Sequence, residues 1–219
     1  MQEGTVNMIK NVYGINKNIK LLDQGTDHSL FRFRSSGRSS LRRKYKLKEK
    51  DFVIIYTGKV ITAKGVHILF EAFSILARKY DSIYLAIVGS GQKDYQKMCL
   101  SYLTKDLNKR VFWIKFQPSK KLPDYYSFSD LAVWPLQESL SMNDAAACER
   151  VFIANDELTS KTRISNNNAL LYKKSDVKDL ARKIEFMYKN PKKRIAMGKR
   201  GRKLVEEKLS WEKIAEGYL

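Results

Sequence analysis

From residue 51 onward, short apolar runs rich in β-branched residues alternate with longer segments of helical period. Strands are predicted at 52–56, 83–88, 111–114, 131–134, 151–154 and 170–172. Helices are predicted at about 66–77, 92–105, 121–128, 141–148, 176–189, 192–208 and 211–219. This alternation is typical of βαβ units. It predicts an α/β, Rossmann-like protein with one parallel sheet and helices on both faces.

Residues 1–50 have a different pattern. They contain weak strand signals, a turn at 24–27 and a basic segment, but no second complete series of strands and helices. We therefore expect a lead-in or hinge segment at 1–50 and one Rossmann-like domain at 51–219.

Composition narrows the function classes. The chain has 219 residues, of which 43% are hydrophobic, so a folded core is expected. Cys99 and Cys148 are too few for a disulfide framework, and His28 and His67 are the only histidines, so no structural metal is expected. No apolar run approaches the roughly 20 residues of a membrane span, and the first residues do not resemble a secretory signal. These features predict a cytoplasmic protein without a transmembrane helix.

Positive charge is concentrated in two stretches. The formal net charge is +19, and segments 32–50 and 189–208 each hold nine basic residues, with one and two acids respectively. Such stretches attract polyanions, and a solvated basic surface is the simplest interpretation. Anionic lipid headgroups are the next candidate, at the inner face of a membrane. Nucleic acid ranks third, because no recognition motif accompanies the charge.

In an open parallel sheet, ligands bind beyond the carboxyl ends of the strands, where the strand order reverses. One candidate strand end carries Gly58 and Lys59, followed by Lys64 and Gly65 at the start of the next helix. Two lysines and the free N–H groups after a glycine turn are the ingredients of a diphosphate site. The alternative is a solvated pair of lysines.

A second candidate strand end is segment 135–144, which includes Glu138 and Asp144. Carboxylates at such a place accept hydrogen bonds from ribose or sugar hydroxyls. Ser141 and Asp144 also have the spacing of a helix capping box, so Asp144 has a structural alternative. The glycines of 89–91 are interpreted as turn residues, and His67 as a packed or surface histidine rather than a catalytic base.

The order of these motifs resembles the C-terminal, nucleotide-sugar-binding lobe of family 4 retaining glycosyltransferases of the GT-B fold, over about residues 10–219. Residues 24–27 with Phe31 look like the N-G-x-D...F hinge, and 56–65 look like the G-R...K-G phosphate motif. Residues 87–91 are similar to the family's second strand end. Residues 135–148 resemble the P-S...E...E-A-M-A-C segment, and 209–211 the closing F-S-W.

The resemblance implies a role for each matching position. Lys59 and Lys64 would neutralise the donor diphosphate, and Glu138 would lie near the sugar. The backbone N–H groups of Ser139, Leu140 and Ser141, together with Gly58, would contact phosphate. Asp144 would bind ribose hydroxyls.

The sequence also departs from the family pattern. Lys59 replaces Arg and Asp144 replaces Glu, and the two acids are two residues closer than in E-x7-E. Glu149 and Ala169 stand where glycine is usual. Glu149 is expected at a helix C-terminus that favours positive φ.

The first hypothesis is therefore a donor-binding glycosyltransferase lobe. It would take a nucleoside diphosphate sugar as substrate, need no metal or other cofactor, and transfer the sugar to a glycan or lipid-linked acceptor. A separate N-terminal lobe or partner chain is expected to complete the enzyme. The second hypothesis is a nucleotide-sugar-binding or regulatory protein of the same fold without turnover. The third is a nucleic-acid-binding α/β domain.

Overall fold

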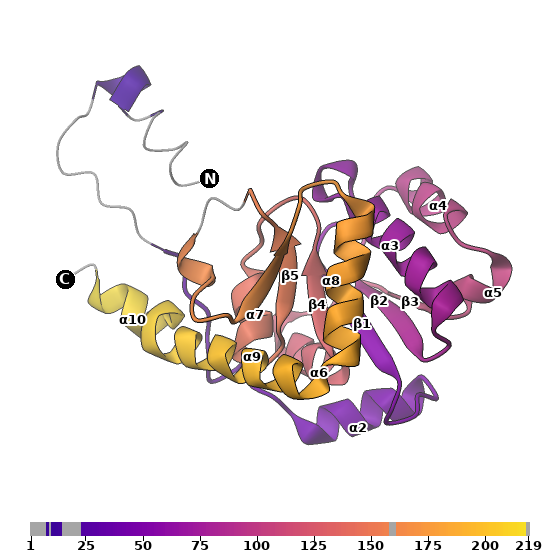
Figure 1. The fold of residues 1–219 in the computed structure, drawn as a ribbon. Coiled ribbons are helices and arrows are strands. Elements are labelled where there is room, and N and C mark those ends of the chain that lie inside the picture. The colour runs from indigo at the N-terminus through magenta and orange to yellow at the C-terminus, as the bar shows by residue number, and fades with distance from the viewer. Residues whose placement is uncertain (1–7, 9, 15–22, 158–160, 218–219) are drawn as a thin grey trace.

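A six-stranded parallel sheet forms the centre of the computed structural model, which describes residues 8, 10–14, 23–157 and 161–217 (Figure 1). The strands lie in the order β3-β2-β1-β4-β5-β6, and every neighbouring pair is parallel. Their bounds are β1 Phe52–Thr57, β2 Ile83–Val88, β3 Val111–Ile114, β4 Leu131–Trp134, β5 Phe152–Asn155 and β6 Ala169–Tyr172. The predicted α/β sheet is confirmed, with strand limits that differ by about one residue.

Helices cover both faces of this sheet. The α-helices are α2 Ser35–Lys44, α3 Val66–Lys79, α4 Lys93–Ser101, α5 Lys105–Asn108, α6 Leu122–Phe128, α7 Ser141–Ala147, α8 Val177–Lys189, α9 Pro191–Leu204 and α10 Trp211–Glu216. Short 3-10 turns lie at Thr62–Lys64, Ser119–Lys121 and Lys161–Arg163, and a π-helical turn lies at Val205–Leu209. Helices α3 and α8 pack together on one face (Figure 1), and α6 and α7 lie on the other, as right-handed crossovers require.

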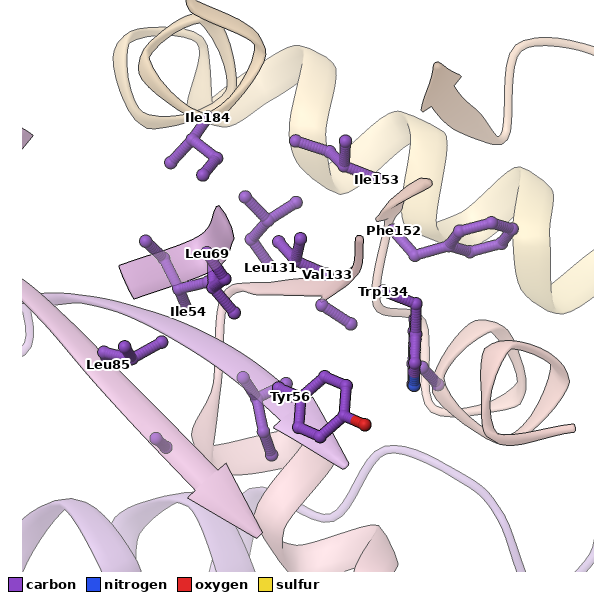
Figure 2. Close-up of a cluster of buried hydrophobic side chains, with 14 of the residues drawn as sticks. Ile54, Tyr56, Leu69, Leu85, Leu131, Val133, Trp134, Phe152, Ile153 and Ile184 are labelled. Atoms are coloured by element: carbon purple, nitrogen blue, oxygen red, sulfur yellow. The ribbon is translucent and has the colours of Figure 1, made fainter. Parts of the chain in front are cut away.

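The core lies between the sheet and these helices. Strands β1 and β4 are buried along their whole length, which explains why their sequences are continuously apolar rather than alternating. Figure 2 shows Leu69 of α3 and Ile184 of α8 beside Ile54 and Leu131 of the sheet; all four side chains are fully buried. This packing fixes the strand ends that carry the candidate site.

Two predicted helices are shorter than expected. The segment expected as one helix at 92–105 is two, because α4 ends at Ser101 and Thr104 begins α5 by accepting a hydrogen bond from the Leu107 N–H at 3.4 Å. The helix expected at 192–208 ends at Leu204 and continues as the π-helical turn. Of the last predicted helix, 211–216 is helical, and 218–219 lie outside the described residues.

Helix α2 was not predicted. Hydrogen bonds from its arginines attach it to the rest of the protein. Arg42 is buried and donates hydrogen bonds to the carbonyls of Lys48 and Asp51, both at 2.6 Å. One turn earlier, Arg38 bonds the carbonyl of Ser129 at 3.2 Å and one oxygen of Asp130 at 3.2 Å. Part of the first basic stretch therefore holds α2 against the lobe. The domain boundary at residue 50 stays a prediction.

The end of α7 confirms the expectation for Glu149. This residue has φ of 59°, in the left-handed region, where the family pattern has glycine. Helix α9 comes very close to it, since a Cβ on Gly198 would lie 2.1 Å from the Glu149 carbonyl oxygen. The backbone path after α7 is thus fixed by a close helix contact.

In the described part of the chain, none of the helices combines the length and the apolar character needed to cross a bilayer.

Candidate functional site at the carboxyl edge of the sheet

The strand order reverses between β1 and β4. Strand β1 pairs with β2 on one side and with β4 on the other, so the loops after β1 and β4 leave the same edge of the sheet side by side. These loops begin at Gly58 and Pro135, and they carry the two motifs that the sequence analysis selected. In this class of sheet, the reversal point is where ligands bind.

A side-chain hydrogen bond holds the backbone of the first loop. The Tyr56 hydroxyl donates to the Lys59 carbonyl at 2.7 Å, and Gly58 has φ of 140°. Gly65, with φ of 65°, ends the 3-10 turn, and a Cβ there would lie 2.4 Å from Leu136 Cγ of the second loop. A glycine is therefore required for both its φ and its close contact with the neighbouring loop.

Lys64 joins the two loops. Its Nζ donates to the Glu138 carbonyl oxygen at 3.3 Å, while Lys59 is exposed nearby. Burial lowers the pKa of the Lys64 ammonium from its ordinary value, and the charge of Lys59 lowers it further. An anion bound between the two lysines would relieve this repulsion.

Gly89 and Gly91 are residues of the turn that follows β2, as expected. A Cβ on Gly89 would lie 1.9 Å from the Gly58 carbonyl oxygen, and one on Gly91 would lie 1.8 Å from that of Val60. Val60 and Gly91 form a parallel bridge that continues the pairing of β1 and β2. The two glycines therefore allow the loops after β1 and β2 to touch.

Glu138 is held by a residue that the sequence analysis missed. One Arg163 NH group lies 3.3 Å from Glu138 Oε2 and 3.4 Å from the Ser139 carbonyl oxygen. Arg163 ends the 3-10 turn that follows β5, so it reaches the site from a third loop at the same edge. An isolated arginine in a polar segment gives no motif. The only available signal was its position after the strand next to β4.

Ser139, Leu140 and Ser141 lead into α7, whose start differs from the capping-box alternative. Leu140 occupies the N-cap position with helical dihedrals and no side-chain cap, and the Ser141 N–H donates to Ser139 Oγ at 3.3 Å. Ser141 is therefore already inside the helix, and Asp144 is four positions past the N-cap rather than three. The capping interpretation of Asp144 is wrong.

Asp144 is instead bonded to the hinge. The Thr26 hydroxyl donates a hydrogen bond to Asp144 Oδ1, and Asn143 Nδ2 donates to the Gln24 carbonyl at 2.9 Å. Burial raises the pKa of Asp144 to about 6, although the Thr26 hydrogen bond opposes this shift. The first turn of α7 thus attaches the lead-in segment to the carboxyl edge of the sheet.

The hinge also contacts segment 209–211. The Thr26 N–H donates to the Leu209 carbonyl at 2.9 Å, and the Trp211 N–H donates to the Thr26 carbonyl at 3.2 Å. A Cβ on Gly25 would lie 3.0 Å from Trp211 Cα, so the segments 24–27 and 209–211 touch backbone to backbone. The hinge motif at 24–27 and the motif at 209–211, which are far apart in the sequence, are thus in direct contact.

His67 lies near the site but is packed. Its Nδ1 is 2.8 Å from the Tyr95 hydroxyl oxygen, and the two rings meet edge to face with centroids 6.0 Å apart. The interpretation as a packed or surface histidine is consistent with this geometry. Within the described ranges, no three His, Cys, Asp or Glu side chains gather as metal ligands would.

Another hollow lies at the opposite edge of the sheet. A cavity of about 560 Å³ opens at the amino edge of the sheet, opposite the candidate site. Four basic side chains line it, among them Arg150 and Arg194, but so do four carboxylates. Its charges therefore balance, and it lacks the excess of cations that an anion site needs.

The sequence matches a known protein family. The sequence model of the family Glycosyl transferases group 1 matches residues 37–204. The capsular polysaccharide biosynthesis glycosyltransferase CapM of Staphylococcus aureus is 28% identical over an alignment of 189 positions, which covers 82% of this chain and 49% of CapM. The chain thus spans about half the length of the relatives it matches.

Solved structures show the same fold. HepE of Anabaena, in complex with UDP and glucose, aligns with a TM-score of 0.80 at 20% identity, over 91% of this chain and 55% of HepE. The C-terminal domain of the group 1 glycosyl transferase LpcC of Francisella tularensis aligns with a TM-score of 0.75 at 20% identity, over 85% of this chain and 100% of that domain. The chain has the fold of one GT-B lobe, and it belongs to the group 1 family of glycosyl transferases.

Proposed function

We propose that this chain is the donor-binding lobe of a glycosyltransferase that takes a nucleoside diphosphate sugar as its donor. The observation that carries the proposal is the meeting of two loops at the reversal point, where Lys64 of one loop bonds the Glu138 backbone of the other. HepE, of the same fold, is described in complex with UDP and glucose, which supports this class of ligand.

In the proposed reaction, the lysines act on the leaving group. When the bond between the sugar and the diphosphate breaks, negative charge grows on the diphosphate oxygens, and Lys59 and Lys64 stabilise it electrostatically. The N–H groups of Ser139 and Leu140 bind phosphate. The Gly58 N–H already donates to the Val88 carbonyl at 3.0 Å, and the Ser141 N–H donates to Ser139 Oγ at 3.3 Å, so these two expected phosphate donors are engaged within the protein. Glu138 accepts a hydrogen bond from a sugar hydroxyl, and Asp144 accepts one from ribose while Thr26 holds one of its oxygens.

We propose that the transfer retains the anomeric configuration and that the acceptor is a glycan or a lipid-linked sugar. CapM is described as acting in capsular polysaccharide biosynthesis, which supports a carbohydrate acceptor. NMR of the product formed from a donor of known configuration would determine the stereochemical outcome. No metal or other cofactor is proposed for the chemistry.

A second lobe is proposed to provide the acceptor side, either on a partner chain or elsewhere in the same protein. Oriented positioning of donor and acceptor can supply roughly 7–11 kcal/mol of barrier reduction. The described residues form one lobe, and Lys59 at its carboxyl edge is exposed. We therefore expect the purified chain to bind donor and to transfer sugar poorly or not at all without that second lobe.

We also propose that the protein acts in the cytoplasm, near an anionic membrane. Lys46, Lys48 and Lys50 are exposed and border a hollow at the amino edge of the sheet, next to Tyr84 and Tyr188. Each exposed lysine near an anionic surface contributes about 1 kcal/mol of attraction. The membrane would thus meet the edge opposite the donor site.

A thermal-shift assay separates the proposed function from the nucleic-acid alternative. UDP-glucose and GDP-mannose are compared with a duplex oligonucleotide, each at two salt concentrations. Stabilisation by a nucleotide sugar supports the proposal, since a ligand that binds only the folded state raises the unfolding temperature. Stabilisation by the duplex alone would contradict it.

A further inference from the structure

Glu138 and Arg163 are both largely withdrawn from solvent. Their side chains are 16% and 8% exposed, and the Arg163 NH group lies 3.3 Å from Glu138 Oε2. A charge-assisted hydrogen bond in a site of low exposure is stronger and more directional than one between exposed side chains. The direction of the Glu138 carboxylate therefore depends on where Arg163 is held.

The backbone of Arg163 is in turn held by Asn168. Its carbonyl accepts a hydrogen bond from Asn168 Nδ2 at 2.9 Å, and Asn168 Oδ1 accepts one from the Ser165 N–H, also at 2.9 Å. Asn168 is 1% exposed and immediately precedes β6, so it connects the Arg163 turn to the sheet. The chain of contacts runs from β6 through Asn168 and Arg163 to Glu138.

Lys64 completes this arrangement from the other side. It bonds the Glu138 backbone carbonyl, whereas Arg163 bonds the Glu138 carboxylate and the Ser139 carbonyl. The two cations thus hold different atoms of the same short segment. Lys64 lies beside Lys59 in the proposed diphosphate site, but Arg163 reaches the segment from the loop after β5.

We propose that Arg163 is a positioning residue, which orients the Glu138 carboxylate toward the sugar of the bound donor. The inference rests on the proposed function of the carboxyl edge. It has a selective consequence, because a carboxylate accepts hydrogen bonds from sugar hydroxyl groups and offers no donor to phosphate. Loss of Arg163 affects recognition of the sugar and leaves recognition of the nucleoside diphosphate nearly unchanged.

The test compares matched ligands by isothermal titration calorimetry on the full chain. UDP-glucose is paired with UDP, and GDP-mannose with GDP. Arg163→Gln and Glu138→Gln are each expected to weaken binding of the nucleotide sugar by about tenfold, the loss typical of a hydrogen bond to a charged group. The corresponding nucleotide is expected to bind within about twofold of the parent, because it lacks the sugar that Glu138 contacts.

Two further variants separate positioning from general damage. Arg163→Lys keeps the charge and is expected to recover part of the sugar affinity, whereas the double variant Arg163→Gln/Glu138→Gln should be no weaker than either single variant. The control is Arg200→Gln. Arg200 is exposed and bonds the carbonyl of Asn167 in the same loop at 3.2 Å, and its loss should change neither affinity.

The failures of the two proposals are distinguishable. Equal weakening of nucleotide and nucleotide sugar by Arg163→Gln, or additive losses in the double variant, would overturn the positioning role while leaving the donor site in place. If Arg163→Gln does not fold, the same comparison is made with Arg163→Lys and Glu138→Gln. A parent chain that binds neither nucleotides nor nucleotide sugars would overturn the proposed function and this inference with it.

Discussion

The Thr26 hydroxyl donates a hydrogen bond to the carboxylate of Asp144, which links the lead-in segment to α7 at the carboxyl edge of the sheet. The pKa of Asp144 is raised to about 6 from an ordinary value of 3.8, with burial as the main cause. The folded protein therefore holds the Asp144 proton more tightly than the unfolded chain does. Stability from this group is complete below about pH 4 and is lost as the pH rises through 6.

Asp144→Asn should remove this pH dependence. Relative to the parent, the variant's free energy of unfolding is expected to rise by about 2 kcal/mol between pH 4 and pH 7. Urea unfolding at unit pH steps measures the difference. Thr26→Val serves as a second variant. It should move the Asp144 transition to higher pH, because the hydrogen bond that favours ionisation is gone. A difference between parent and Asp144→Asn that is constant with pH would refute this assignment.

Gly65 should tolerate no side chain while Leu136 is present. Gly65→Ala is expected to lower the free energy of unfolding by about 2 kcal/mol, from the positive φ and from the 2.4 Å approach to Leu136 Cγ. Adding Leu136→Ala should recover the steric part of that loss, which urea unfolding of the single and double variants measures. Strictly additive losses would show that the two loops do not meet there.

Arg42 should be structural, whereas its neighbour Arg43 should not. Arg42→Met leaves the carbonyls of Lys48 and Asp51 without their donor, and is expected to cost about 3 kcal/mol of unfolding free energy. Arg43→Met, at an exposed position of the same helix, should stay within about 0.5 kcal/mol of the parent. Equal effects of the two changes in a urea titration would contradict the description of α2.

Binding to vesicles should increase with the fraction of anionic lipid and decrease with salt. Replacing Lys46, Lys48 and Lys50 by glutamine should weaken sedimentation with anionic vesicles at least about tenfold, since each lysine contributes about 1 kcal/mol. A matched triple change of exposed lysines on α4 and α5, Lys93, Lys97 and Lys105, should have a smaller effect. Binding that is the same for neutral vesicles would exclude the membrane proposal.

The strands of the sheet could be predicted from the sequence, but the polar contacts that attach other segments to it could not. The strands were predictable because buried parallel strands are continuously apolar, as in β1. Helix α2 was missed because arginine hydrogen bonds to carbonyls, rather than an apolar stripe, hold it in place. The pairs Thr26 with Asp144 and Arg163 with Glu138 join residues 118 and 25 positions apart, and no local spacing signals them.

The role of the two lysines is tested most directly by donor binding. The parent chain is titrated with UDP-glucose and GDP-mannose, and the measurement is repeated for Lys59→Ala, Lys64→Ala and, as a control, the exposed Lys105→Ala. We predict that the parent binds at least one nucleotide sugar, that each site variant weakens this binding several-fold, and that the control does not. Binding by the parent that neither Lys59→Ala nor Lys64→Ala weakens would contradict the placement of the donor diphosphate at the carboxyl ends of β1 and β4.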